Sequence, residues 1–98
     1  MNIPNDPVIQ ELIGEFVDTW IEDLNRDYAN LISSQNSDDL YRLAHTLKGS
    51  CFQFGLDEIA EMGIKLMELV KNNNWNEAKS YEEPLKSKFV EVKNMLEK

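Results

Sequence analysis

The spacing of apolar residues constrains the fold of this chain more than any other feature. In four successive segments, apolar residues recur at every third or fourth position, which places them on one face of a helix. No segment alternates apolar and polar residues in the manner of a half-buried strand. Four amphipathic helices with short connections favour an all-α fold, an antiparallel up-down four-helix bundle. We expect residues 1–98 to form this bundle as a single domain.

The first helix is expected to begin at Asp6, a suitable N-terminal cap, with Pro7 as its first helical residue. Its apolar stripe then continues as far as Leu31. Gly14 lies early in this long segment, and glycine is a poor helix former. A short extra N-terminal helix, separated from a longer one at Gly14, is therefore an alternative to one continuous helix.

The second helix is predicted over residues 38–54, with Ser37 as its N-terminal cap and Gly55 as the residue that ends it. The third helix is predicted over residues 57–70 and ends in the polar sequence KNNN. Both segments are long enough to bury one apolar face against the rest of a bundle.

The fourth helix is expected to start at Asn74, which has the spacing of a capping box with Glu77. Pro84 then interrupts its apolar stripe. Because proline lacks a backbone N–H and clashes with the preceding turn, we expect either a kink near Glu83 or two collinear pieces.

The charge balance narrows the classes of function. The net charge is −8 at pH 7, so we do not expect a nucleic-acid partner, whose phosphates require a basic surface. The same charge is unfavourable at an anionic membrane surface, and the sequence shows neither a long apolar run nor a signal peptide. Cys51 is the only cysteine and cannot form an internal disulfide, which is typical of a cytoplasmic protein. We expect a monomer.

His45, the only histidine in the chain, lies in the second predicted helix. On a helical wheel it faces away from the arc expected in the core, which contains Leu40, Leu43, Ala44, Leu47, Cys51 and Phe54. The residues that share its outward side are Tyr41, Arg42, Lys48, Gly49 and Phe52. The simplest interpretation is an ordinary exposed histidine. A metal site is not expected, because the chain has no second histidine and its cysteine lies on the opposite face.

Two neighbours of His45 favour a functional interpretation. Gly49 lies inside the helix, where glycine costs about 1 kcal/mol relative to alanine. Either it allows close packing of another helix, or it leaves the imidazole accessible to a partner. Lys48 is either a solvated charge or a cation for an anionic group attached to His45. Histidine is a competent nucleophile near neutral pH, where much of it is uncharged.

These residues resemble a known family. The segments AHTLKGS (residues 44–50) and FGLDEIAEM (residues 54–62) are similar to the histidine-containing phosphotransfer (HPt) domains of two-component phosphorelays. The resemblance implies that His45 is phosphorylated through its solvent-facing ring nitrogen. It also implies that Lys48 helps to hold the phosphoryl group and that Gly49 leaves room for the incoming domain. The implied partners are response-regulator receiver domains or a hybrid sensor histidine kinase.

The chain departs from the family pattern at one position. In the family, the facing helix often presents a glutamine or glutamate that hydrogen-bonds near the histidine, and here Met67 stands at the position expected for it. Methionine cannot orient an imidazole through a strong hydrogen bond. Either the adjacent Glu68 takes this role or His45 is oriented less firmly. Lys71, one turn further along the helix, could add positive potential to the site.

The sequence has no G-x-x-x-x-G-K phosphate loop, so we expect a phosphoryl carrier that does not use ATP. Whether such a carrier is classed as an enzyme is left open. No intrinsic cofactor is expected; the receiver domain would bring Mg²⁺ and the aspartate. The residues considered for the partner-docking face are Tyr41, Arg42, Phe52, Ile9 and Ile13.

Each docking residue also has a structural interpretation. Ile9 and Ile13 could simply be core residues, and Phe52 could pack against a neighbouring helix. For the whole chain, the alternative function is a non-catalytic docking module in which His45 is never phosphorylated. A purely structural acidic bundle is a third interpretation, but it leaves Gly49 and the pairing of Lys48 with His45 unexplained.

Overall fold

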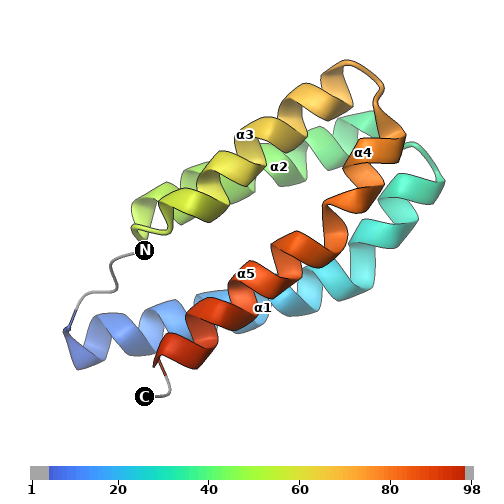
Figure 1. Ribbon diagram of the computed structural model, residues 1–98. Coiled ribbons are helices and arrows are strands. Elements are labelled where there is room, and N and C mark those ends of the chain that lie inside the picture. Colours follow the sequence, from blue (N-terminus) through green and yellow to red (C-terminus); the bar gives the residue numbers. More distant parts are fainter. Residues whose placement is uncertain (1–4, 97–98) are drawn as a thin grey trace.

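Two pairs of antiparallel helices make up the structure, a computed structural model that describes residues 5–96 (Figure 1). The helices are α1 (Pro7–Ser33), α2 (Ser37–Gln53), α3 (Asp57–Lys71), α4 (Trp75–Ser80) and α5 (Glu82–Leu96). Figure 1 shows α2 beside α3 and α1 beside α5, and these are the two most extensive helix contacts. The prediction of an antiparallel helical bundle is confirmed, with its fourth helix divided into α4 and α5.

The start of α1 is capped as the sequence predicts. The Asp6 carboxylate accepts a hydrogen bond of 2.9 Å from the Val8 backbone N–H, and Pro7 is the first helical residue. The alternative of a break at Gly14 is wrong, because α1 continues through it for 27 residues and no separate helix precedes it within residues 5–96. Ile13 and Val17, on either side, are fully buried. Burying side chains of this size contributes roughly 1.5–3 kcal/mol each, which exceeds the cost of about 1 kcal/mol for glycine.

The first three helices end in the same backbone motif. The residue that follows each C-cap has a positive φ: Gln35 at 50°, Gly55 at 76° and Asn73 at 57°. After α2, the Leu56 N–H donates to the Cys51 carbonyl at 2.8 Å, and the Gly55 N–H donates to the Phe52 carbonyl at 3.1 Å. This pair of bonds satisfies the last carbonyls of the helix and turns the chain sharply. The role of Gly55 is confirmed, and equivalent bonds follow α1 and α3.

The N-terminal cap of α2 differs from the prediction. Asn36 is the cap, and its side-chain oxygen accepts from the Asp39 N–H at 3.2 Å, whereas Ser37 is already helical. The Asn36 amide also donates to the Asp39 carboxylate at 2.9 Å. Asparagine can make both bonds because its side chain has a carbonyl oxygen that accepts and a separate amide group that donates. The single, shorter hydroxyl of serine cannot make both at once in this geometry.

The fourth helix of the bundle breaks earlier than expected. Asn74 caps α4 by accepting from the Glu77 N–H at 3.4 Å, as predicted. The break lies at Tyr81, three residues before Pro84. Pro84 instead falls in the first turn of α5. Backbone N–H groups there have no partner within the helix, so the proline, which lacks an N–H, costs no helical hydrogen bond. Of the two alternatives, a kink near Glu83 or two pieces, the structure has two pieces, α4 and α5, which meet at Tyr81.

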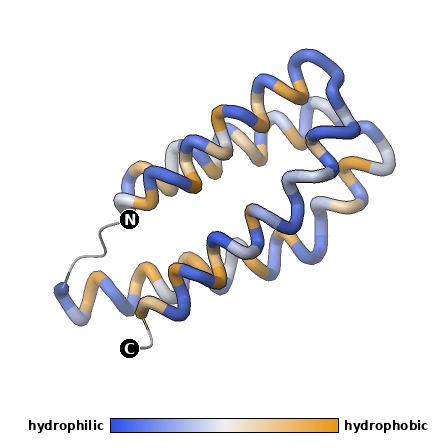
Figure 2. Tube along the Cα trace, viewed as in Figure 1, coloured by the Kyte–Doolittle hydropathy of each residue, from blue (hydrophilic) through white to orange (hydrophobic). Residues whose placement is uncertain are grey.

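The core lies between the two helix pairs, and its buried residues are apolar in the part of the chain that the structure describes. Figure 2 shows hydrophobic positions recurring along every long helix between hydrophilic ones. Phe16 of α1 contacts Phe54, the residue that ends α2, at a centroid distance of 4.6 Å and so joins the two pairs. Within the α1–α5 pair, Trp20 stacks on Phe89 at 6.2 Å. The buried Tyr28 hydroxyl donates to the Ala78 carbonyl and so ties α1 to α4. No described helix is long and apolar enough to cross a membrane.

Within α2, the predicted core arc is confirmed. Leu40, Ala44, Leu47 and Cys51 are fully buried, and Leu43 and Phe54 pack against them partly exposed. The apolar surroundings of Cys51 raise the pKa of its thiol to about 12, because burial disfavours the charged thiolate.

We predict that Cys51 reacts slowly with thiol reagents in the native protein, since the thiolate is the reactive species. At pH 8 a disulfide reagent should label the folded chain at least tenfold more slowly than the chain in denaturant. Both rates can be followed by absorbance on one preparation. A native rate close to the denatured rate would show that α2 is rotated and that its outward face is not the one described below.

Candidate functional site

His45 lies in the middle of α2 on its solvent-exposed side. The neighbouring Ala44 and Leu47 are fully buried, and they fix the rotation of the helix so that His45 must face outward. Among residues 5–96, no hydrogen bond or ion pair involves the imidazole. An exposed imidazole without a partner keeps a ring nitrogen available to attack an electrophile.

Gly49, one turn after His45, is not required by helix packing. A Cβ atom placed on Gly49 meets no atom within 4 Å outside its own helix segment. The close-packing interpretation of this glycine is therefore wrong, and the surface beside the imidazole is open. The cost of a glycine inside a helix is not offset by any contact of the described residues.

Gly63 of α3, which the sequence analysis did not single out, is the glycine that packing requires. A Cβ atom on Gly63 would lie 3.1 Å from the Ala44 carbonyl oxygen and 3.2 Å from the backbone nitrogen of Lys48. These two atoms belong to consecutive turns of α2 that enclose His45, so α3 lies directly against the backbone that carries the histidine. The available signal was a glycine on the apolar arc of the third predicted helix.

Two cations lie near the histidine without a carboxylate partner. Lys48 of α2 and Lys71 of α3 form no ion pair with any described residue, although the chain has 18 acidic and 10 basic residues. Both line a hollow of about 290 Å³ between the two helices, together with Tyr41, Ile64, Met67 and Glu68. We call it the Lys71 hollow. Its free cations can attract an anionic group.

The two candidates for orienting His45 make no bond to it. Met67 is partly buried and lines the Lys71 hollow. Glu68 is exposed and pairs with Lys65 of its own helix at 3.8 Å. Within residues 5–96, neither side chain forms a hydrogen bond with the imidazole.

The apolar residues predicted for docking divide into two groups. Phe52 is 45% exposed, Tyr41 is 39% exposed and Ile9 is 38% exposed. Ile13 is fully buried, so its place in a docking face is wrong and it belongs to the core. Ile64, which helical spacing alone did not single out for docking, is 39% exposed and lines the Lys71 hollow.

A second hollow contains His45 itself. It has a volume of about 370 Å³ and is lined by Asp38, Tyr41, Arg42 and His45, all on α2. We call it the His45 hollow. Tyr41 lines both hollows.

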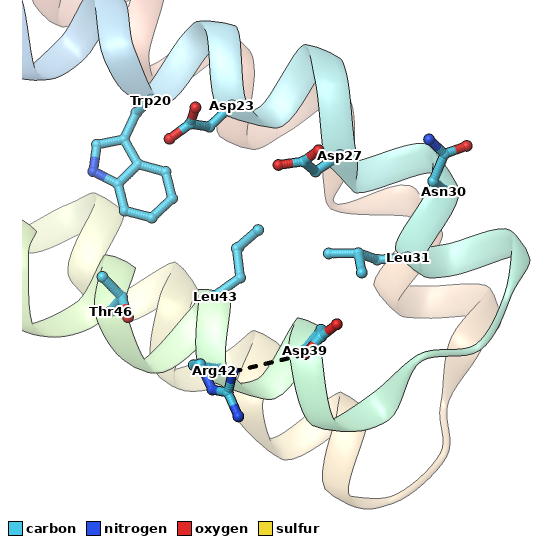
Figure 3. Close-up of a pocket in the computed structure, with 9 residues that line it drawn as sticks. All are labelled: Trp20, Asp23, Asp27, Asn30, Leu31, Asp39, Arg42, Leu43 and Thr46. Atoms are coloured by element: carbon cyan, nitrogen blue, oxygen red, sulfur yellow. Dashed lines mark ion pairs between the residues drawn. The ribbon is translucent and has the colours of Figure 1, made fainter.

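A larger groove of about 510 Å³ separates α1 from the neighbouring face of α2 (Figure 3). Trp20 and Leu43 contribute apolar surface, and Asp23 and Asp27 contribute carboxylates from α1. Both carboxylates are paired with Arg26 at 2.9–3.0 Å. The groove has no histidine among its lining residues, and its α1 carboxylates are held by Arg26, so we place the candidate functional site on the outward face of α2.

Comparison with protein families identifies the class of protein to which the chain belongs. The chain belongs to the Hpt domain family, whose model matches residues 11–98. Membership of this family implies phosphotransfer within a phosphorelay, and Hpt domains interact with receiver domains and kinases. Comparison with curated proteins and with solved structures finds no match.

The two glycines near His45 should respond in opposite ways to an added side chain. Gly49→Gln should raise the free energy of unfolding by roughly 0.5–1 kcal/mol, because it gains helix propensity in open space. Gly63→Ala should lower it by about 1–3 kcal/mol, because the methyl group meets the α2 backbone, which cannot move aside. Chemical denaturation measures both values, and changes of the same sign would contradict the helix arrangement.

Proposed function

We propose that this chain is a phosphorelay intermediate that accepts a phosphoryl group on His45 and passes it on. The observation that carries the proposal is an exposed imidazole without a partner, beside a glycine that no packing contact explains. The phosphoryl donor and acceptor would be the aspartate of a response-regulator receiver domain or of a hybrid sensor histidine kinase.

In the accepting step, the lone pair of the solvent-facing ring nitrogen attacks the phosphorus of an aspartyl phosphate. The P–N bond to His45 forms as the P–O bond breaks, and the aspartate carboxylate leaves with the electron pair. The other ring nitrogen keeps its proton. Donation runs through the same steps in reverse, so the chain needs no general acid or base of its own.

The surroundings of His45 suit this chemistry. The charge of the transferring group is spread over three equatorial oxygens, which fixed cations stabilise. Lys48 has no carboxylate partner and lies three residues after His45, on the same side of α2. The receiver domain would supply Mg²⁺ and the aspartate, since this sequence has no phosphate loop with which to use ATP. Phe52 and Ile64 offer exposed apolar surface for docking.

The alternative, a docking module that is never phosphorylated, also has a supporting observation. No hydrogen bond from the facing helix holds the imidazole in one orientation. A preorganised side chain is usual where transfer is fast. A direct assay of phosphate on His45 separates the two functions.

We predict that His45→Gln removes all phosphoryl acceptance and leaves the fold intact. Substitutions at exposed positions usually change stability by less than about 0.5 kcal/mol. The assay mixes the purified chain with phosphorylated receiver domains and measures acid-labile phosphate, with chemical denaturation as the control for folding. Acid-labile phosphate on the variant would refute the assignment of the nucleophile.

A graded series at Gly49 tests access to the imidazole. Transfer from a phosphorylated receiver should slow in the order Gly49, Gly49→Ala, Gly49→Gln, because a larger side chain one turn from His45 obstructs the approaching domain. Stability should follow a different order, with the alanine variant the most stable because alanine has the highest helix propensity. Equal transfer rates in all three proteins would show that access past Gly49 is not needed.

A further inference from the structure

The position of the imidazole within α2 decides which side chains can contact its solvent-facing ring nitrogen. Side chains of an α-helix lie over the turn that precedes their own Cα atom. The His45 ring therefore leans toward Tyr41 and Arg42, one turn earlier, and away from Lys48. The lining of the His45 hollow agrees, because it contains Tyr41 and Arg42 but not Lys48.

Arg42 is free to change its partner. Its guanidinium lies 3.8 Å from the Asp39 carboxylate, which is longer than a hydrogen bond, and its side chain is 78% exposed. Exposed ion pairs of this kind contribute little to stability. Figure 3 shows the Arg42 side chain extending away from the α1 residues of the groove. Breaking this contact would leave Asp39 hydrogen-bonded to Asn36.

We propose that Arg42 is the second cation of the site and binds the phosphoryl group once it is attached to His45. The inference rests on the proposed function. The guanidinium fork can donate two parallel hydrogen bonds to phosphoryl oxygens, which an ammonium group cannot do in a fixed geometry. Lys48 approaches the same group from the following turn. Arg42 thus acts on the phosphoryl group itself and not only on a docking partner.

Lys71 is the competing candidate for this role. It is unpaired, but it lines the Lys71 hollow, from which His45 is absent. Arg42 lines the edge of the groove along α1 and also shares the His45 hollow with the imidazole, and is therefore the better placed of the two cations.

The test uses phosphoramidate, a small-molecule phosphoryl donor, to phosphorylate the full chain, followed by a pH titration of the phosphohistidine ³¹P signal. A cation beside the phosphoryl group favours its dianion and lowers its pKa. Arg42→Gln should therefore raise that pKa by roughly half a unit to one unit, the size expected for one charge about 4 Å away near water. Arg42→Lys should restore part of the shift, and Lys79→Gln, on α4, should leave the pKa unchanged.

The other charged groups around the site are present in all of these proteins. Their effects on the phosphohistidine pKa are therefore the same in the variants as in the unmodified sequence. These groups are Asp38, Asp39 and Lys48 of α2, Glu68 and Lys71 of α3, and Asp23 and Asp27 of α1. A phosphohistidine pKa that is the same in Arg42→Gln as in the unmodified sequence overturns this inference alone. A chain that phosphoramidate does not phosphorylate on His45 overturns the proposed function and this inference with it.

Discussion

The contact between α2 and α3 at Gly63 is the interaction on which the site depends. Without a side chain at Gly63, α3 lies against the α2 backbone at Ala44 and Lys48, and this contact holds the turn that carries His45. Because the buried side of α2 is fixed there, the imidazole must face solvent. Two glycines near His45 therefore have different roles. Gly63 allows α3 to pack closely against α2, and Gly49 leaves the exposed surface beside His45 open.

Electrostatics around His45 differ from those of the molecule as a whole. The chain carries a net charge of −8, yet Lys48, one turn after the histidine, and Lys71 on the facing helix have no carboxylate partner among the described residues. Elsewhere, bases such as Lys86, Lys88 and Lys93 are paired with acids. Unpaired cations on an acidic protein make the local potential less negative, which favours the approach of an anionic group. This local charge is compatible with the phosphotransfer that membership of the Hpt family implies.

Most of the fold could be predicted from local patterns, and the errors have physical causes. The cap at Asp6, the helix end at Gly55 and the buried arc of α2 depend on residues within one or two turns of each other. The break at Tyr81 and the continuity of α1 through Gly14 depend instead on what the helices pack against. Ile9 and Ile13 show the same limit: helical spacing cannot tell which of two apolar residues a neighbouring helix covers, and only Ile13 is buried.

The number of long amphipathic helices and the outward side of His45 follow from spacing along single segments, and the motif around His45 indicates the family. Tertiary packing is needed to show that α3 meets α2 at Gly63 and that Lys71 lies in one hollow with Lys48. It also decided that the imidazole has no orienting partner on the facing helix. These features join residues on different helices, and their relative position is set by how side chains of the whole core fit together, which no local pattern encodes.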